Sequence, residues 1–146
     1  MYFVDQSKIE QTLIYMEEIL LEIKKQSFSS KIEKFGLERM VHVLIESILD
    51  VGNMMIDGFI MRDPGSYNDI IDILIDEKVL PAEEEEQGYK SVIGLRRMLV
   101  NDYTDINHSM LIEIMRDKEE MLGKFSQNIR IYLKNELGVA NAFSNE

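Results

Sequence analysis

Residues 95–103 decide the fold and read Leu-Arg-Arg-Met-Leu-Val-Asn-Asp-Tyr. At helical spacing, Leu95 and Leu99 continue an apolar stripe that starts at Val92. Arg96 begins a second stripe that ends at Tyr103, seven residues later. The stretch is therefore predicted to be an amphipathic helix whose polar side carries two adjacent arginines and ends in a tyrosine.

The flanking segments also repeat apolar residues at three- and four-residue intervals, without the alternation typical of strands. Helices are predicted at residues 5–25, from 31 or 34 to 61, at 67–76, from 81 to about 102, and from the cap residues 104–107 to about 136. Gly138 is predicted to end the last helix. We therefore expect an all-α, up-and-down bundle of four long helices and one short helix, with a single domain at residues 1–137 and a tail at 138–146.

Composition narrows the classes of function. The chain has 146 residues, a net charge of −11, two histidines and no cysteine. Broad electrostatic attraction to nucleic acid is unfavourable at this charge, although a local basic site is compatible with it. We expect no disulfide, no His-rich metal site and no cofactor. No apolar run reaches membrane-spanning length and the start lacks a signal pattern, so a cytoplasmic protein that binds no membrane is expected.

Two motifs resemble HepT-like proteins of the HEPN group, small all-helical ribonuclease toxins and their relatives. The family motif reads Arg-x4-His-x-Tyr, and here Arg96 and Tyr103 occupy its ends. Asn101 stands where the family has histidine. A second match is Pro-Gly-Ser-Tyr at residues 64–67, followed by a short apolar helix and a Val-Leu-Pro turn at residues 79–81.

The resemblance implies metal-independent RNA cleavage in a cleft between two subunits, with arginine and histidine sharing the chemistry. Arg96 can bind a phosphate through two hydrogen bonds. Asn101 cannot act as a base, although its amide can orient an oxygen or a water. Because general acid–base catalysis contributes about 10²–10⁴-fold, we expect cleavage to be impaired while RNA or nucleotide binding is retained.

The second predicted helix carries a polar stripe that includes Asp50 and Asn53. This stripe is either a solvated face or the wall of the cleft, and relatives often carry such polar residues one turn apart. The helix also has two apolar faces, which we interpret as a central helix covered by its own chain or by a second subunit. We expect Arg96, Asn101 and Tyr103 to face Asp50 and Asn53 near a dimer cleft, with Arg97 more exposed.

Arg96 and Asn101 lie about 140° apart on a regular helix. The helix is therefore expected to end or distort by Val100, unless a second subunit completes the site. Either histidine could in principle replace the missing one. However, His108 fits no version of the motif spacing, and His42 reaches the cleft only if the polar stripe faces it.

In related toxin–antitoxin pairs, a nucleotidyltransferase antitoxin attaches AMP to the tyrosine that corresponds to Tyr103. The resemblance therefore makes Tyr103 a candidate AMP acceptor and such an antitoxin a candidate partner. Judged from the residues alone, Tyr103 is an aromatic side chain at a helix end that packs its ring and exposes its hydroxyl. The leading interpretation is a HepT-like homodimer with impaired cleavage. The alternatives are an active ribonuclease toxin neutralised by an antitoxin, and a non-enzymatic helical interaction module.

Overall fold

The computed structural model describes residues 2–81 and 85–144, with side chains up to residue 138, and this part is all-helical. Its six helices are α1 (Gln6–Lys25), α2 (Lys31–Gly58), α3 (Tyr67–Asp76), α4 (Glu86–Val100), α5 (His108–Asp117) and α6 (Glu119–Ser144). The all-α prediction is confirmed. None of these helices combines the length and apolar character needed to cross a membrane.

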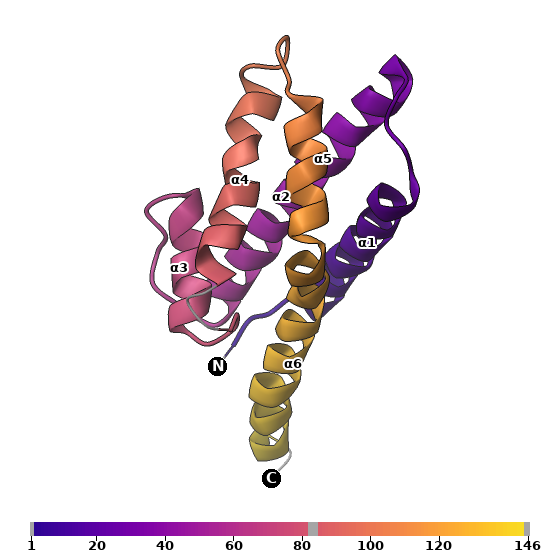
Figure 1. Ribbon diagram of the computed structural model, residues 1–146. Helices are drawn as coiled ribbons and strands as arrows, with labels where there is room; N and C mark the ends of the chain where they lie inside the picture. Colours follow the sequence, from indigo (N-terminus) through magenta and orange to yellow (C-terminus); the bar gives the residue numbers. More distant parts are fainter. Residues whose placement is uncertain (1, 82–84, 145–146) are drawn as a thin grey trace.

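The long helix α2 is the centre of the fold. It contacts α1, α3, α4 and α5, and Figure 1 shows α1 on one side of it with α3 and α4 on the other. The two predicted apolar faces are buried within the single chain, from Leu37 to Met55 on one and from Ile45 to Ile56 on the other, but Ile60, the last residue of the second face, is exposed. The protein's own helices therefore cover the middle of α2, whereas Ile32 and Phe35 at its start remain exposed.

Local side-chain caps fix where the helices begin. The Ser30 hydroxyl accepts a hydrogen bond from the Glu33 amide, and the Glu33 carboxylate accepts one from the Ser30 amide. This reciprocal capping starts α2 at Lys31. The Ser66 hydroxyl, as predicted, caps α3 by accepting a hydrogen bond from the Asp69 amide, while the Asp69 carboxylate accepts one from the Gly65 amide. α2 ends at Gly58, before the predicted residue 61, and Ile60 there has a left-handed φ of 56°.

The last predicted helix is in fact two, so the expectation of four long helices and one short one is wrong in detail. The chain bends at Lys118, between α5, which packs on α2 and α4, and α6, which packs on α1. Backbone hydrogen bonds continue on both sides of the bend, from Lys118 to Ile114 and from Leu122 to Lys118. Because the helical spacing of apolar residues is also maintained, periodicity alone could not show the bend.

Gly138 does not end the last helix. α6 continues to Ser144, so the predicted tail of residues 138–146 is helical through residue 144, and the C-terminal end of α6 extends beyond the other helices (Figure 1). Glycine in a helix interior costs only about 1 kcal/mol relative to alanine. Gly138 has no positive φ, and thus none of the geometry of a glycine cap.

Candidate functional site

Arg96 is held against α2 and α3 rather than directed into solvent. Burial of Val92, Leu95 and Leu99 turns one side of α4 into the core and leaves Arg96 on the neighbouring side. Its Nε donates a hydrogen bond of 2.6 Å to Glu46 Oε1 on α2. Its guanidinium carbon lies 4.9 Å from the centre of the Tyr67 ring, at the start of α3, within cation–π range.

These contacts favour the charged and oriented form of the arginine. The hydrogen bond that Arg96 donates to Glu46 is the largest cause that raises the pKa of Arg96 above its usual value, and the charge of Glu46 adds to it. The Arg96 side chain is 28% exposed, so one edge still reaches solvent. The site therefore presents a permanent, positioned positive charge on an otherwise acidic chain.

An open pocket brings three of the predicted site residues together. Its lining includes Arg96, Arg97 and Asn101 from the end of α4, and Ser66 and Tyr67 from the start of α3. α4 ends at Val100, as the predicted geometry required, although the Asn101 amide still donates to the Arg97 carbonyl at 2.8 Å. Arg97 and Asn101 are exposed, so their functional groups can meet a ligand in this pocket.

Tyr103 lies in a different pocket. It is 67% exposed and shares an open hollow with Lys31, Lys34 and Phe35 at the start of α2. His108, at the start of α5, lines the same hollow, and its Nε2 lies 2.7 Å from a carboxylate oxygen of Glu38. The structure thus places the tyrosine beside the first turns of α2 and not in the Arg96 pocket.

The polar stripe of α2 does face α4, but the residue that meets Arg96 is Glu46, one turn before Asp50. Asp50 is exposed and lines a third hollow together with Glu46 and Tyr15. Asn53 is exposed on α2. The prediction that Arg96 faces the polar stripe agrees with the structure, but the expected partners Asp50 and Asn53 are replaced by Glu46.

The predicted site residues did not include Glu46 or Tyr67, and His42 was considered only on the condition that the polar stripe faces the cleft. His42 precedes Glu46 by one helical turn, and its Nε2 lies 3.6 Å from Glu46 Oε1. The available signal was the spacing of His42 and Glu46 on the polar stripe, which brings the two side chains together on one face. Their relation to Arg96 depends on how α4 packs on α2, which the spacing does not contain.

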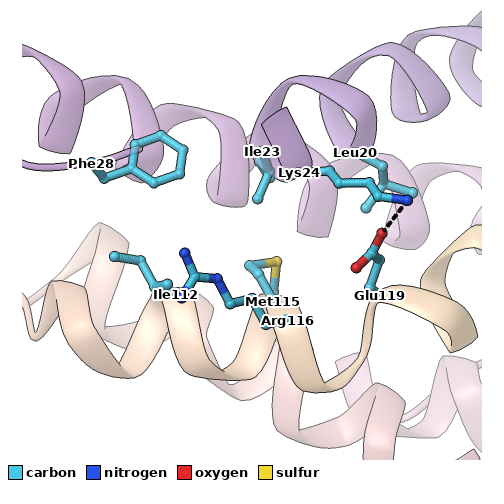
Figure 2. Close-up of a pocket in the computed structure, with 8 residues that line it drawn as sticks. All are labelled: Leu20, Ile23, Lys24, Phe28, Ile112, Met115, Arg116 and Glu119. Carbon is cyan, nitrogen blue, oxygen red and sulfur yellow. Dashed lines mark ion pairs between the residues drawn. The ribbon is translucent and has the colours of Figure 1, made fainter. Parts of the chain in front are cut away.

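A pocket with both apolar and charged lining residues lies away from these residues, between the C-terminal half of α1 and α5 (Figure 2). Ile23 and Phe28 face Ile112 and Met115 across it. At one end, Lys24 Nζ and a Glu119 carboxylate oxygen form an ion pair of 3.2 Å. This pocket contains none of the residues that the sequence singled out.

Comparison with known proteins identifies the family. The model of the family described as "Ribonuclease HepT-like" matches residues 9–129 of this chain. The Bacillus subtilis protein named "Putative RNase YutE" is 48% identical over 144 residues, which are 98% of this chain and 99% of that protein. An Archaeoglobus fulgidus protein named "Putative RNase" is 26% identical over 82% of this chain and 89% of its own length.

Two solved structures are similar to this chain. The structure of Bacillus subtilis YutE, described as a cytosolic protein of unknown function, has a TM-score of 0.91 and 48% identity, and covers 94% of this chain and 96% of its own. A tri-AMPylated Shewanella oneidensis HEPN toxin in complex with an MNT antitoxin has the same fold, with a TM-score of 0.74 at 16% identity over 84% of this chain and 96% of its own. The chain therefore belongs to the HepT-like family of HEPN-related ribonucleases.

Proposed function

We propose that this chain is a homodimeric HepT-like protein that binds RNA or nucleotides around Arg96 and cleaves RNA slowly. The observation that carries this proposal is the position of Arg96, which Glu46 and Tyr67 hold at the rim of an open pocket also lined by Arg97 and Asn101. A fixed guanidinium beside a second arginine suits a phosphate group.

The geometry of Arg96 leaves its phosphate-binding edge available. Glu46 accepts from Nε, and within the described part of the chain the two terminal nitrogens make no hydrogen bond to a side chain. Those two nitrogens can donate in parallel to the oxygens of one phosphate. The Tyr67 ring, half exposed beside the guanidinium, adds an aromatic face for a base or ribose.

The Tyr103 hollow is a second contact region for the same strand. Lys31 and Lys34 supply positive charge, and Phe35 and Tyr103 are exposed aromatic rings. Proteins bind single-stranded nucleic acid with this combination, because rings stack on bases while cations neutralise phosphates. Since the net charge is −11, attraction of RNA depends on these local groups.

Asn101 is the reason for the proposed slow rate. The amide accepts and donates hydrogen bonds but takes no proton from a ribose hydroxyl at accessible pH. Loss of a general base removes about 10²–10⁴-fold of rate. Arg96 would still stabilise the charge that develops on the phosphate, so binding and slow cleavage persist together.

The proposed dimer and partner rest on exposed side chains. Exposed apolar side chains outside the proposed RNA contacts include Ile32 at the start of α2 and Val100 at the end of α4, which a second subunit would cover. We further propose that Tyr103 is the acceptor for AMP from a nucleotidyltransferase antitoxin, because its hydroxyl is accessible and the Shewanella HEPN toxin is itself AMPylated. A cytoplasmic location follows the description of YutE as cytosolic.

The test is binding of a fluorescently labelled, single-stranded RNA, measured by fluorescence anisotropy at several salt concentrations. Arg96→Ala is expected to weaken binding about tenfold or more and to reduce the salt dependence, because one phosphate contact is lost. Arg116→Ala is the matched control, since Arg116 lines the separate pocket between α1 and α5. Equal effects of the two variants would contradict the proposal, and light scattering that shows a monomer would remove the dimer.

A further inference from the structure

The guanidinium of Arg96 and the imidazole of His42 both lie next to one carboxylate oxygen of Glu46. Glu46 Oε1 accepts the 2.6 Å hydrogen bond from Arg96 Nε and lies 3.6 Å from His42 Nε2. The imidazole comes from α2 and the guanidinium from α4, so the pairing arises only in the folded chain. The His42 side chain is 29% exposed, so part of the imidazole reaches solvent.

We propose that His42 is the general base for RNA cleavage at this site, supplied by α2 in place of the histidine that α4 lacks at position 101. The inference rests on the proposed function, because it assigns the base for a strand bound at Arg96. It explains how slow cleavage can persist with asparagine in the motif. It also gives Glu46 two roles, since the same carboxylate orients the arginine and faces the imidazole.

The step balances as an internal transfer of the phosphoryl group. A ring nitrogen of His42 takes the proton of the ribose 2′-hydroxyl, and the 2′-oxygen forms a bond to the adjacent phosphorus. The bond from phosphorus to the 5′-oxygen breaks, and that oxygen takes a proton from water. The products are a 2′,3′-cyclic phosphate and a 5′-hydroxyl, and the imidazolium then returns its proton to the solvent.

Glu46 suits the imidazolium that forms in this step. A carboxylate near one ring nitrogen stabilises the protonated ring and favours the tautomer whose other nitrogen accepts a proton. Arg96 donates to the phosphate oxygens on which charge accumulates. His42 is a weaker base than a histidine at the motif position would be. The 3.6 Å between His42 Nε2 and Glu46 Oε1 is longer than a hydrogen bond, and the Glu46 carboxylate also binds Arg96.

The other histidine is differently placed and provides a matched control. His108 Nε2 lies 2.7 Å from Glu38, beside Tyr103 rather than beside Arg96. The titratable and charged side chains that the structure places around Glu46 and Arg96 come from four helices: Tyr15 from α1, His42 and Asp50 from α2, Tyr67 from α3, and Arg97 from α4. A general base acts only in its deprotonated form, so the cleavage rate should rise with pH.

The experiment follows cleavage of an end-labelled single-stranded RNA at high protein concentration, from pH 5 to 8, with RNA affinity measured in parallel by anisotropy. His42→Gln is expected to lower the rate about 100-fold and to remove its rise with pH, while the RNA affinity changes less than about threefold. His108→Gln should retain most of the wild-type rate. Adding Asn101→His to His42→Gln should restore cleavage, which shows that the variant is folded.

Each remaining outcome is decisive. The inference is overturned if His42→Gln cleaves as fast as wild type, if His108→Gln loses as much rate, or if the products lack the cyclic phosphate. It is also overturned if wild type binds RNA but does not cleave it, and in that case the proposed RNA site survives. Failure of wild type to bind RNA at all would instead contradict the proposed function.

Discussion

Gly52 is the position at which one added methyl group should disturb the contact between α2 and α3. A Cβ at Gly52 would lie 2.5 Å from Ile70 Cγ2 and 3.5 Å from Leu74 Cδ1, whereas carbon atoms pack best at about 3.5–4.0 Å. Ile70 is buried and β-branched, so it has few rotamers with which to yield. Gly52→Ala therefore forces α3 away from α2, at a cost of about 1–3 kcal/mol.

Gly36→Ala is the matched control, because Gly36 lies in the same helix and an added Cβ there meets nothing within 4 Å. Both variants gain about 1 kcal/mol of helix propensity, so the difference between them reports the clash alone. At about 4 °C per kcal/mol for a chain of this size, Gly52→Ala should melt about 4–12 °C below Gly36→Ala.

Thermal melts followed by circular dichroism, with urea denaturation as a second measure, test this expectation. Gly52→Ala should also weaken RNA binding, because α3 carries Tyr67 against Arg96. Equal melting temperatures for the two variants, or a higher one for Gly52→Ala, would refute the close packing of α3 on α2.

Two further predictions concern ion pairs. Arg62 and the Gly65 amide donate hydrogen bonds to the Asp69 carboxylate and lower its pKa to about 2, and the bond from Arg62 is the largest cause. The ionised carboxylate therefore stabilises the folded state above the ordinary carboxyl pKa near 4, and this stabilisation is lost as pH falls toward 2. The melting-temperature gap between wild type and Asp69→Asn should therefore close between about pH 4 and 2, and a constant gap would contradict this. Arg130 joins Glu10 and Glu17 of α1 to α6, so Arg130→Gln should lower the urea-derived free energy of unfolding on the order of 1 kcal/mol, less in high salt, and an unchanged value would contradict it.

The helices could be predicted because their signals are local. Apolar spacing marks the buried faces, and the hydroxyls of Ser30 and Ser66 mark two helix starts through hydrogen bonds three residues along the chain. The bend at Lys118 left no such signal, because the helical hydrogen bonds and the apolar spacing both continue past it. Gly138 gave a false signal, because a cap requires a left-handed conformation that this glycine does not adopt.

The site was predictable only in part, because some of its contacts join residues that are far apart in the sequence. The motif residues Arg96 and Asn101 are near in sequence and line one pocket at the end of α4, although Asn101 keeps a helical backbone conformation. The partner of Arg96 is fifty residues away, and only the packing of α4 on α2 selects Glu46 over Asp50. His42 was a conditional candidate from the sequence, and the packing of α4 on α2 shows that it lies 3.6 Å from the carboxylate oxygen that binds Arg96.

The rate of RNA cleavage by Asn101→His tests the central claim most directly. The claim is that the pocket around Arg96 binds RNA but lacks the base of the family motif. Asn101→His should therefore raise the rate of single-stranded RNA cleavage about 100-fold or more over wild type. Adding Arg96→Ala to this variant should abolish the gain. Asn101→Gln, which keeps the amide, should give no increase. The claim is contradicted if Asn101→His binds RNA as tightly as wild type and cleaves it no faster.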